Sequence, residues 1–115
     1  MTTIKQYCLA LDLKDNPELI AEYEKYHRHV WPEIIESIKD SGIKKLDIYR
    51  TGNRLFMIME TGEDFSFEKK AAADTANPKV QEWEELMWKF QQALPGSKPG
   101  EKWSLMKKIF SLEEA

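Results

Sequence analysis

A β-hairpin signal in the middle of the chain most constrains how this sequence folds. Residues 44–61, KKLDIYRTGNRLFMIMET, read as two strands joined at Gly52 and Asn53. That pair supplies the positive φ values that a tight hairpin turn needs. The chain is therefore predicted to build an antiparallel sheet around this hairpin.

The second strand of this hairpin carries apolar residues on both sides. Side chains alternate along a strand, so Leu55, Met57 and Met59 lie on one face and Phe56 and Ile58 on the other. Helices can cover only one face of such a sheet. We therefore expect a homodimer in which the sheets of two copies face each other and enclose a barrel-like α+β interior.

The N-terminal half supplies one further strand and two helical segments. Residues 4–13 alternate as a strand does. Residues 15–30 then read as a helix, with an Asp or Asn cap and a proline at the first helical position. Pro32 lacks an N–H group and disfavours helix at the preceding residue, so we expect a break near Trp31 and a second helical piece ending at Gly42.

The C-terminal half is expected to complete the fold. Residues 66–75 and 78–94 read as two helical pieces, the second beginning at a proline and closed by Pro-Gly. A loop at residues 96–102 and a final strand at residues 103–112 follow. The order β-α-β-β-α-β predicts an α+β protein with the ferredoxin-like arrangement, in which helices cover one face of an antiparallel sheet. We expect residues 1–115 to form one domain, because a chain of this length fits a single core.

Charge and cysteine content exclude several classes of partner. The net charge is −3 and the Lys and Arg residues are scattered, so no basic stripe exists to hold nucleic-acid phosphates. No apolar run approaches the ~18 residues of a membrane span, and Asp12 and Lys14 come too early for a signal peptide. Cys8 is the only cysteine, which fits a reducing compartment. We therefore expect a cytoplasmic protein with neither nucleic acid nor membrane as a partner.

A stripe of aromatic residues and one histidine marks the first helix. Tyr23, His27 and Trp31 follow one another at i, i+4 and i+8, so on a helix they face the same way. His29 lies about 200° round the helix from His27, which excludes a His-x-His metal chelate. By pattern alone, His27 is more commonly a hydrogen-bonded core residue than an acid/base catalyst. If it is catalytic, its chemistry is proton transfer, because no nucleophile or metal signature accompanies it.

The helix expected at residues 78–94 carries a second apolar stripe. Trp83, Leu86, Met87 and Phe90 recur at the spacing of a core-facing surface, and core packing is the ordinary role of the last three. Trp83 also suits a binding site. An indole at a pocket edge offers a flat apolar face and one N–H donor, which fits the C–H face of a sugar ring.

Four motifs resemble those of one known family, the L-rhamnose mutarotases. They are EYEKYHRHVWPE at residues 22–33, the Gly42 that follows, DIYRTGNRLFMIME at residues 47–60 and NPKVQEWEELM at residues 77–87. The family pattern is Glu-Tyr, a His four residues after the Tyr, and Trp-Pro-Glu four residues after the His. So many defined residues at fixed offsets rarely recur by chance. The resemblance covers nearly the whole chain.

The resemblance implies a dimeric α+β barrel that interconverts the α and β anomers of a 6-deoxyhexose without a cofactor or a metal. By the same resemblance, His27 is the proton donor, and Tyr23 and Trp83 contact the sugar. Ring opening needs a proton delivered to the ring oxygen and one removed from the anomeric hydroxyl, so one imidazole with a polar partner suffices. The alternative is a non-catalytic or oxygenase-like dimeric barrel that binds a small ligand.

Two positions depart from the family pattern. Leu46 and Glu84 stand where the rhamnose enzymes carry a tyrosine on the second strand and a second tryptophan beside the first. Replacing a phenol and an indole with an alkyl group and a carboxylate changes stacking and hydrogen bonding, so L-fucose is the leading alternative sugar. The predicted catalytic residue is His27, and the predicted substrate contacts are Tyr23, Trp31, Leu46, Trp83 and Glu84.

Overall fold

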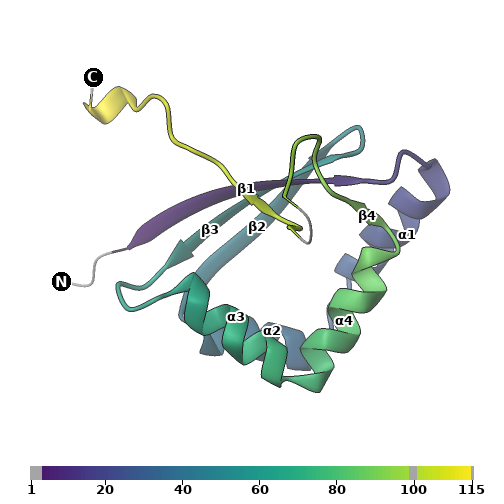
Figure 1. Ribbon diagram of the computed structural model, residues 1–115, viewed down its shortest axis with the longest axis horizontal. Coiled ribbons are helices and arrows are strands. Elements are labelled where there is room, and N and C mark those ends of the chain that lie inside the picture. Colours follow the sequence, from purple (N-terminus) through teal and green to yellow (C-terminus); the bar gives the residue numbers. More distant parts are fainter. Residues whose placement is uncertain (1–3, 99–100, 115) are drawn as a thin grey trace.

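An antiparallel sheet with four helices on one side makes up the structure, a computed structural model that describes residues 4–98 and 101–114. The elements are β1 (Lys5–Leu13), α1 (Pro17–His27), α2 (Pro32–Asp40), β2 (Ile43–Thr51), β3 (Arg54–Thr61), α3 (Phe67–Ala76), α4 (Pro78–Trp88), β4 (Gln91–Gln92), β5 (Ser104–Leu105) and a short 3₁₀ turn (Leu112–Glu114). Figure 1 shows the helices gathered on one side of the strands.

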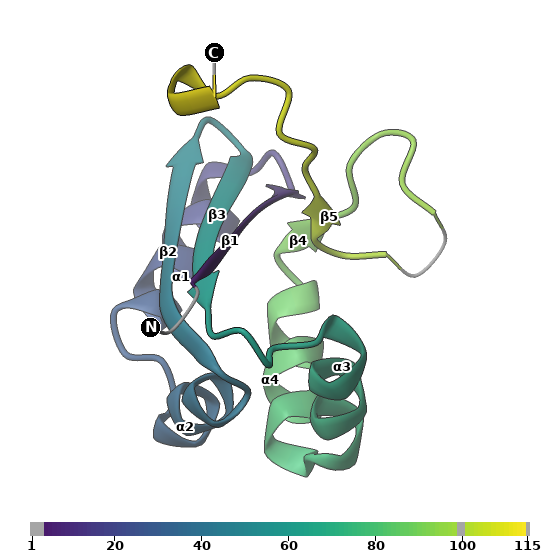
Figure 2. The same cartoon turned by 90° about the vertical axis from the view of Figure 1, so that its left-hand side faces the viewer.

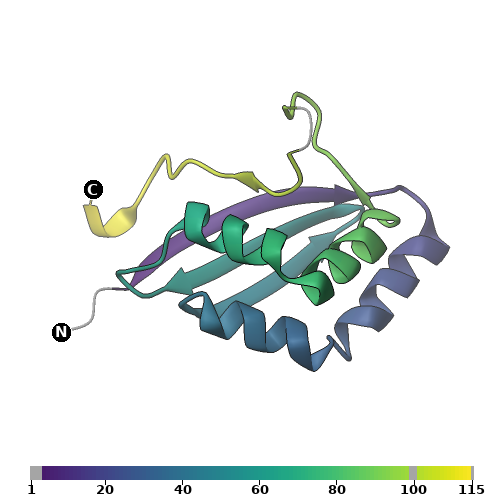
Figure 3. The same ribbon diagram turned by 60° about the horizontal axis from the view of Figure 1, so that its bottom comes forward.

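The strand order confirms the ferredoxin-like α+β fold. The sheet runs β2-β3-β1-β4, and β5 also pairs with β1. Every paired neighbour is antiparallel. The two strands of the predicted hairpin lie at one edge, and β1 lies between that hairpin and the short C-terminal strands. Figure 3 looks onto the helix-covered face.

The start of α1 and the limits of α2 follow the local sequence closely, whereas α1 ends at His27, before residue 30 where the predicted helix ended. The Asn16 side chain accepts two hydrogen bonds, of 3.0 and 3.2 Å, from N–H groups of the first turn of α1. Trp31 is extended, with ψ at 137°, immediately before Pro32. Gly42 has a φ of +95°, a conformation that lets the chain turn from α2 into β2.

The hairpin turn differs in detail from the prediction. Gly52 has a φ of +57°, but Asn53 does not have a positive φ. Asn53 instead holds the end of β1: its backbone oxygen accepts from the Leu13 N–H at 2.6 Å, and its side-chain amide donates to the Leu13 oxygen at 3.0 Å. The tertiary contact with β1 therefore sets the conformation of the second turn residue.

The helix predicted at residues 78–94 is too long. α4 ends at Trp88, and the next residues join the sheet. The Lys14 N–H donates to the Phe90 oxygen at 2.8 Å, and Gln91 lies opposite Leu13 in the ladder. The edge of β1 satisfies these backbone groups in place of another helical turn.

The final strand predicted at residues 103–112 is also too long, since only Ser104–Leu105 is a strand. β4 and β5 pair with successive parts of the same edge of β1, and Figure 2 shows residues 93–98, which follow β4, looping out beside the sheet. After Met106 donates to the Cys8 oxygen at 2.8 Å, the chain leaves the sheet. Residues 106–114, here called the C-terminal arm, run away on the side opposite to the helices (Figure 1). Ile109 is 91% exposed and Phe110 70% exposed, so the apolar side chains whose alternation had suggested a strand are not covered by another layer of the described chain.

A bulge near the start of β2 decides which of its residues face the helices. The pairing register with β3 shifts there, so that Leu46 lies opposite Met59 and Ile48 opposite Met57. These four side chains share the helix-covered face, where the core lies. Leu46 and Ile48 are half-buried against that core, on the side where the candidate site is built.

The opposite side of the sheet has no helix over it within the described residues. Ala10, Tyr49 and Phe56 lie abreast on neighbouring strands, and Ile58 lies beside Cys8. We call this side the open face. Both faces of β3 are apolar, as the sequence indicated, but this chain covers only one of them.

Candidate active site

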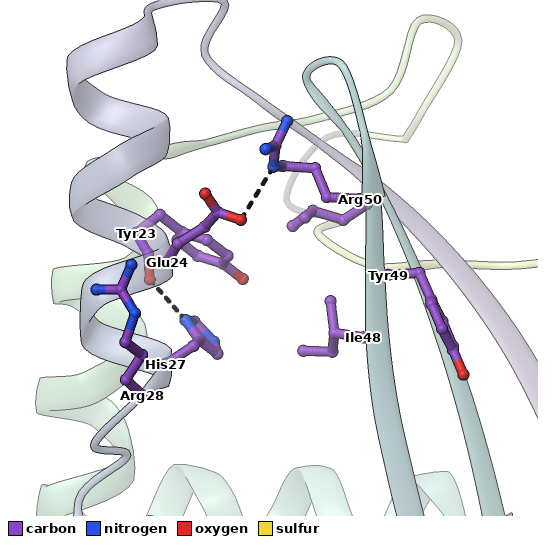
Figure 4. Close-up of a pocket in the computed structure, with 8 residues that line it drawn as sticks. Tyr23, Glu24, His27, Arg28, Ile48, Tyr49 and Arg50 are labelled. Atoms are coloured by element: carbon purple, nitrogen blue, oxygen red, sulfur yellow. Dashed lines mark hydrogen bonds and ion pairs between the residues drawn. The ribbon is translucent and has the colours of Figure 1, made fainter.

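α1 presents Tyr23 and His27 toward the sheet from successive turns. His27 Nδ1 lies 2.9 Å from the backbone oxygen of Tyr23, and the two ring centroids are 4.2 Å apart. Because a carbonyl oxygen only accepts, Nδ1 carries the hydrogen of the neutral imidazole and Nε2 keeps its lone pair. Figure 4 shows both side chains pointing from α1 toward Ile48 on β2.

The environment of His27 favours the neutral imidazole. Burial lowers the pKa of His27 below its ordinary value of 6.5, and the hydrogen bond to the Tyr23 carbonyl opposes this shift only in part. At neutral pH the ring is therefore uncharged. Its free nitrogen can accept a proton and return it.

The Tyr23 hydroxyl is the second polar group beside His27. Burial raises the pKa of Tyr23 to about 12, against a smaller lowering effect of its hydrogen bond with Gln91. The Gln91 amide, through Nε2, donates to the hydroxyl oxygen at 3.4 Å. Tyr23 is therefore a protonated phenol throughout the physiological pH range.

Trp83 of α4 joins this pair from a different part of the chain. Its ring lies 5.7 Å from the His27 ring at 64°, and 5.1 Å from Trp31 at 69°. Tyr26 approaches it at 6.4 Å, nearly perpendicular. Such edge-to-face contacts fix ring orientation, so the imidazole is held against a rigid aromatic wall.

The first cavity, of about 290 Å³, lies between α1 and β2. Tyr23 and His27 line it from the helix and Ile48 from the sheet (Figure 4). A half-exposed ion pair of 3.3 Å between Glu24 and Arg50 lies beside it. Figure 4 also shows the Tyr49 ring pointing to the other side of β2, toward the open face.

A second cavity, of about 190 Å³, lies between α4 and the sheet. The structure brings the predicted contacts Leu46, Trp83 and Glu84 together in its wall, and Gln91 lines it as well. The two cavities are neighbours, because Trp83 packs against His27 and Gln91 contacts Tyr23. These contacts form the wall between the two cavities, with His27 and Tyr23 on one side and Trp83 and Gln91 on the other.

Glu84 lies at the partly exposed side of the second cavity. Its carboxylate is 4.0 Å from Lys102 Nζ, and that ammonium group lies 5.3 Å from the centre of the Trp88 ring. The carboxylate is therefore accessible and charge-paired. It is free to accept further hydrogen bonds.

Trp31 is the predicted contact that the structure separates from the others. It lines an outer groove of about 410 Å³ with Tyr26 and His29, and it reaches the site only through its contact with Trp83. α1 ends at His27 and residues 28–31 are not helical, so the stripe of α1 does not extend to Trp31. Helical periodicity alone did not take account of that turn.

Several polar residues in the second cavity were not predicted from the sequence. They are Gln91, Lys102 and the ion pair of Lys70 with Asp74, whose charged atoms are 2.6 Å apart. Gln91 was placed in a helix and Lys102 in a loop, so neither had a face assigned to it. The only sequence signal was a pair of glutamines directly after the apolar stripe that ends at Phe90.

Within residues 4–98 and 101–114, no three His, Cys, Asp or Glu side chains gather closely enough to hold a metal ion. None of the helices in those ranges is both long and apolar enough to cross a membrane.

The fold and the site together define a ferredoxin-like α+β protein with a neutral histidine and a protonated tyrosine beside an aromatic-walled cavity. A sequence profile of the L-rhamnose mutarotase family matches residues 6–112. The chain is 50% identical to an L-fucose mutarotase of Xanthomonas campestris, over 98% of this chain and 92% of that protein. It is 34% identical to an L-rhamnose mutarotase of Phocaeicola vulgatus, over 72% of this chain and 78% of that protein.

A solved structure is similar over almost the entire chain. The crystal structure of an L-rhamnose mutarotase from Formosa agariphila superposes with a TM-score of 0.69, covering 94% of this chain and 98% of that one at 20% identity. The chain belongs to the L-rhamnose mutarotase family. This membership confirms the resemblance inferred from the motifs and the prediction of an isomerase that acts as a sugar mutarotase.

Proposed function

We propose that this protein interconverts the α and β anomers of a 6-deoxyhexose, with L-fucose preferred over L-rhamnose, and that His27 transfers the proton. The observation that carries the chemistry is the single orientation of the His27 ring. Nδ1 is held by the Tyr23 carbonyl, so Nε2 is the nitrogen available at the cavity. The lowered pKa of His27 makes this nitrogen a base at neutral pH.

The proposed reaction needs one proton to move between two oxygens of the sugar. His27 Nε2 takes the proton of the anomeric hydroxyl, the bond between C1 and the ring oxygen breaks, and C1 becomes an aldehyde carbon. The imidazolium then gives that proton to the former ring oxygen. Both oxygens are bonded to C1 in the closed ring, so one nitrogen reaches both. Rotation about the C1–C2 bond and the reverse steps yield the other anomer, and positioned acid/base catalysis of this kind contributes roughly 10²–10⁴-fold.

The choice of sugar rests on the second cavity and on the relatives. Trp83 offers an apolar face to the C–H side of the ring, and the accessible carboxylate of Glu84 can accept hydrogen bonds from two adjacent hydroxyls. A site that hydrogen-bonds hydroxyls distinguishes their stereochemistry more strongly than one that fits a methyl group. The relative that is 50% identical is named for L-fucose, which supports the same choice.

Saturation-difference NMR, which transfers magnetisation between anomers, tests this function directly. We expect the purified protein to speed anomer exchange of L-fucose more than that of L-rhamnose. Exchange of L-rhamnose alone would reverse the proposed preference. Binding of either sugar without faster exchange would support a ligand-binding barrel instead, and the catalytic proposal would fail.

The protein is further proposed to act as a homodimer in which two open faces pack together. The open face carries a groove whose lining includes Ala10, Tyr49, Phe56 and Met106, together with Arg50 and Arg54. The C-terminal arm lies on the same side of the sheet and exposes more apolar side chains. The same patch on two copies is self-complementary about a two-fold axis, which is the commonest way to cover such a surface. A cytoplasmic location, indicated by the single cysteine, stays a prediction.

A further inference from the structure

Gln91 is a buried residue whose side-chain amide contacts Tyr23, the neighbour of the proposed catalytic His27. Gln91 is only 6% exposed and lies on the two-residue strand β4. The pairing of its backbone with Leu13 fixes its place at the edge of the sheet. From there the side chain lines the second cavity and reaches the Tyr23 hydroxyl of the first.

The direction of the hydrogen bond between Gln91 and Tyr23 determines what the tyrosine can do. The amide N–H donates to the phenol oxygen at 3.4 Å. Among the residues that the structure describes, no protein group accepts the hydrogen of the Tyr23 hydroxyl. That hydrogen is therefore available to another acceptor in the cavity, which Tyr23 lines beside His27.

We infer that Gln91 is a positioning residue that keeps the Tyr23 hydroxyl as a hydrogen-bond donor to a sugar oxygen. This inference rests on the proposed function, because it needs a sugar beside His27. An amide suits the role, since it supplies a donor without adding a charge to a buried site. A residue that accepted from Tyr23 would use the same hydrogen that the sugar requires.

The substitution Gln91→Glu tests this inference, because residue 91 then accepts a hydrogen bond from Tyr23 instead of donating one, while its shape is nearly unchanged. The introduced carboxylate accepts the hydrogen of the Tyr23 hydroxyl, which then has none to offer the sugar. We expect kcat for anomer exchange at pH 7.5 to fall roughly 10- to 10²-fold with little change in KM, because a donor aimed at a developing charge acts mainly in the transition state.

The pH dependence distinguishes positioning from packing. A protonated carboxyl group has an O–H that can donate to the tyrosine as the amide does. Burial raises the pKa of a carboxyl group above its usual value of about 4.3. The ratio of the Gln91→Glu rate to the unsubstituted rate should therefore rise as pH falls from 7.5 to about 5. The titration of His27 is fitted separately in each protein, because a nearby carboxylate favours the charged imidazolium and raises the pKa of His27 in the variant.

Gln92→Glu is the matched control, since it makes the same change at the adjacent, exposed position. We expect near-normal rates for it at all pH values. Gln91→Met removes the donor without introducing an acceptor, so its loss should be smaller and independent of pH. Equal, pH-independent losses in the Gln91→Glu and Gln91→Met proteins would reduce Gln91 to a packing role.

A normal rate in Gln91→Glu at pH 7.5 would also overturn the inference, since it would mean that the tyrosine can donate to residue 91 without loss. Either result leaves the proposed function intact. If the unsubstituted protein fails to catalyse exchange, it is the proposed function that fails. The two failures are therefore separated by the same set of measurements.

Discussion

The two faces of the sheet carry similar apolar side chains but have different surroundings. On the helix-covered face, Met57 and Met59 meet the core, and Leu46 lines the second cavity. On the open face, Phe56 and Ile58 of the same strand have no covering helix within the described residues. One face builds the candidate site inside the chain, whereas the other carries the surface proposed as the dimer interface.

The residues of β3 beside the candidate site and those in the proposed dimer interface therefore lie on opposite faces of the same strand. Alternate residues of β3 point to opposite sides, so a substitution at one position affects mainly one of the two roles. Activity and assembly can then be perturbed independently.

Replacing His27 should have the largest effect on the covered face. His27→Asn keeps a polar side chain of similar shape but removes the proton acceptor, so anomer exchange should fall roughly 10²–10⁴-fold. His29→Asn is the matched control, because His29 is exposed on the same segment and should tolerate the change. Circular dichroism should be unchanged for both. A His27→Asn protein with near-normal exchange would mean that another group transfers the proton.

Placing a charge on the open face should disrupt the dimer. Phe56→Asp replaces an aromatic ring in the proposed interface with a carboxylate, so dimerisation should weaken by about 10²-fold or more. Sedimentation velocity at micromolar concentration measures this. Ile35→Asp is the control, because Ile35 is an exposed apolar residue on α2, away from the open face. An unsubstituted protein that sediments as a monomer would contradict the packing of two open faces.

Replacing Glu84 should change which sugar is preferred rather than the proton transfer by His27. In Glu84→Trp an indole replaces the carboxylate proposed to accept from sugar hydroxyls. The ratio of L-fucose to L-rhamnose exchange rates should fall by about tenfold. Glu85→Trp, one residue further on and exposed, should leave the ratio unaltered. If both substitutions leave it unaltered, Glu84 is a surface acid without a role in selectivity.

Lowering the pH should produce the smallest change near neutrality. The pKa of His27 is lowered below 6.5, so the ring is already neutral above that pH and the rate should vary less than about twofold between pH 7 and 8. As pH falls further, protonation removes the base and the rate should drop. Phe56→Asp should keep this profile, since it acts on the other face. A rate that rose on acidification would mean that the imidazolium starts the cycle.

Local signals predicted the wall of the site that α1 supplies. The spacing of Tyr23 and His27 and the cap at Asn16 depend on residues within a few turns of one another, and the structure has both as expected. The same reasoning did not succeed at Trp31. The helix ends at His27, before Trp31, and the indole lines a different groove.

The wall of the second cavity depends on long-range strand pairing, and part of it could not be predicted from the sequence. Gln91 continued a helical pattern and was assigned to α4, but the unpaired edge of β1 drew it into the sheet. A bulge near the start of β2 decided that Leu46 faces the helices. Neither the available edge nor the register shift can be read from neighbouring residues.

Apart from β4 (Gln91–Gln92), which was not predicted, the sequence was sufficient to predict the order of strands and helices, the apolar character of both faces of β3, the pairing of Tyr23 with His27 on one turn of helix, and the family. These features depend on side-chain periodicity and on prolines and glycines at fixed positions, which act over short distances. Only the tertiary structure decided that Gln91 donates to Tyr23, that Leu46, Trp83 and Glu84 share a cavity, and that the C-terminal arm leaves the sheet. Such contacts join residues far apart in the chain. They depend on whether a backbone or side-chain group pairs with the edge of the sheet or stays in the helix layer.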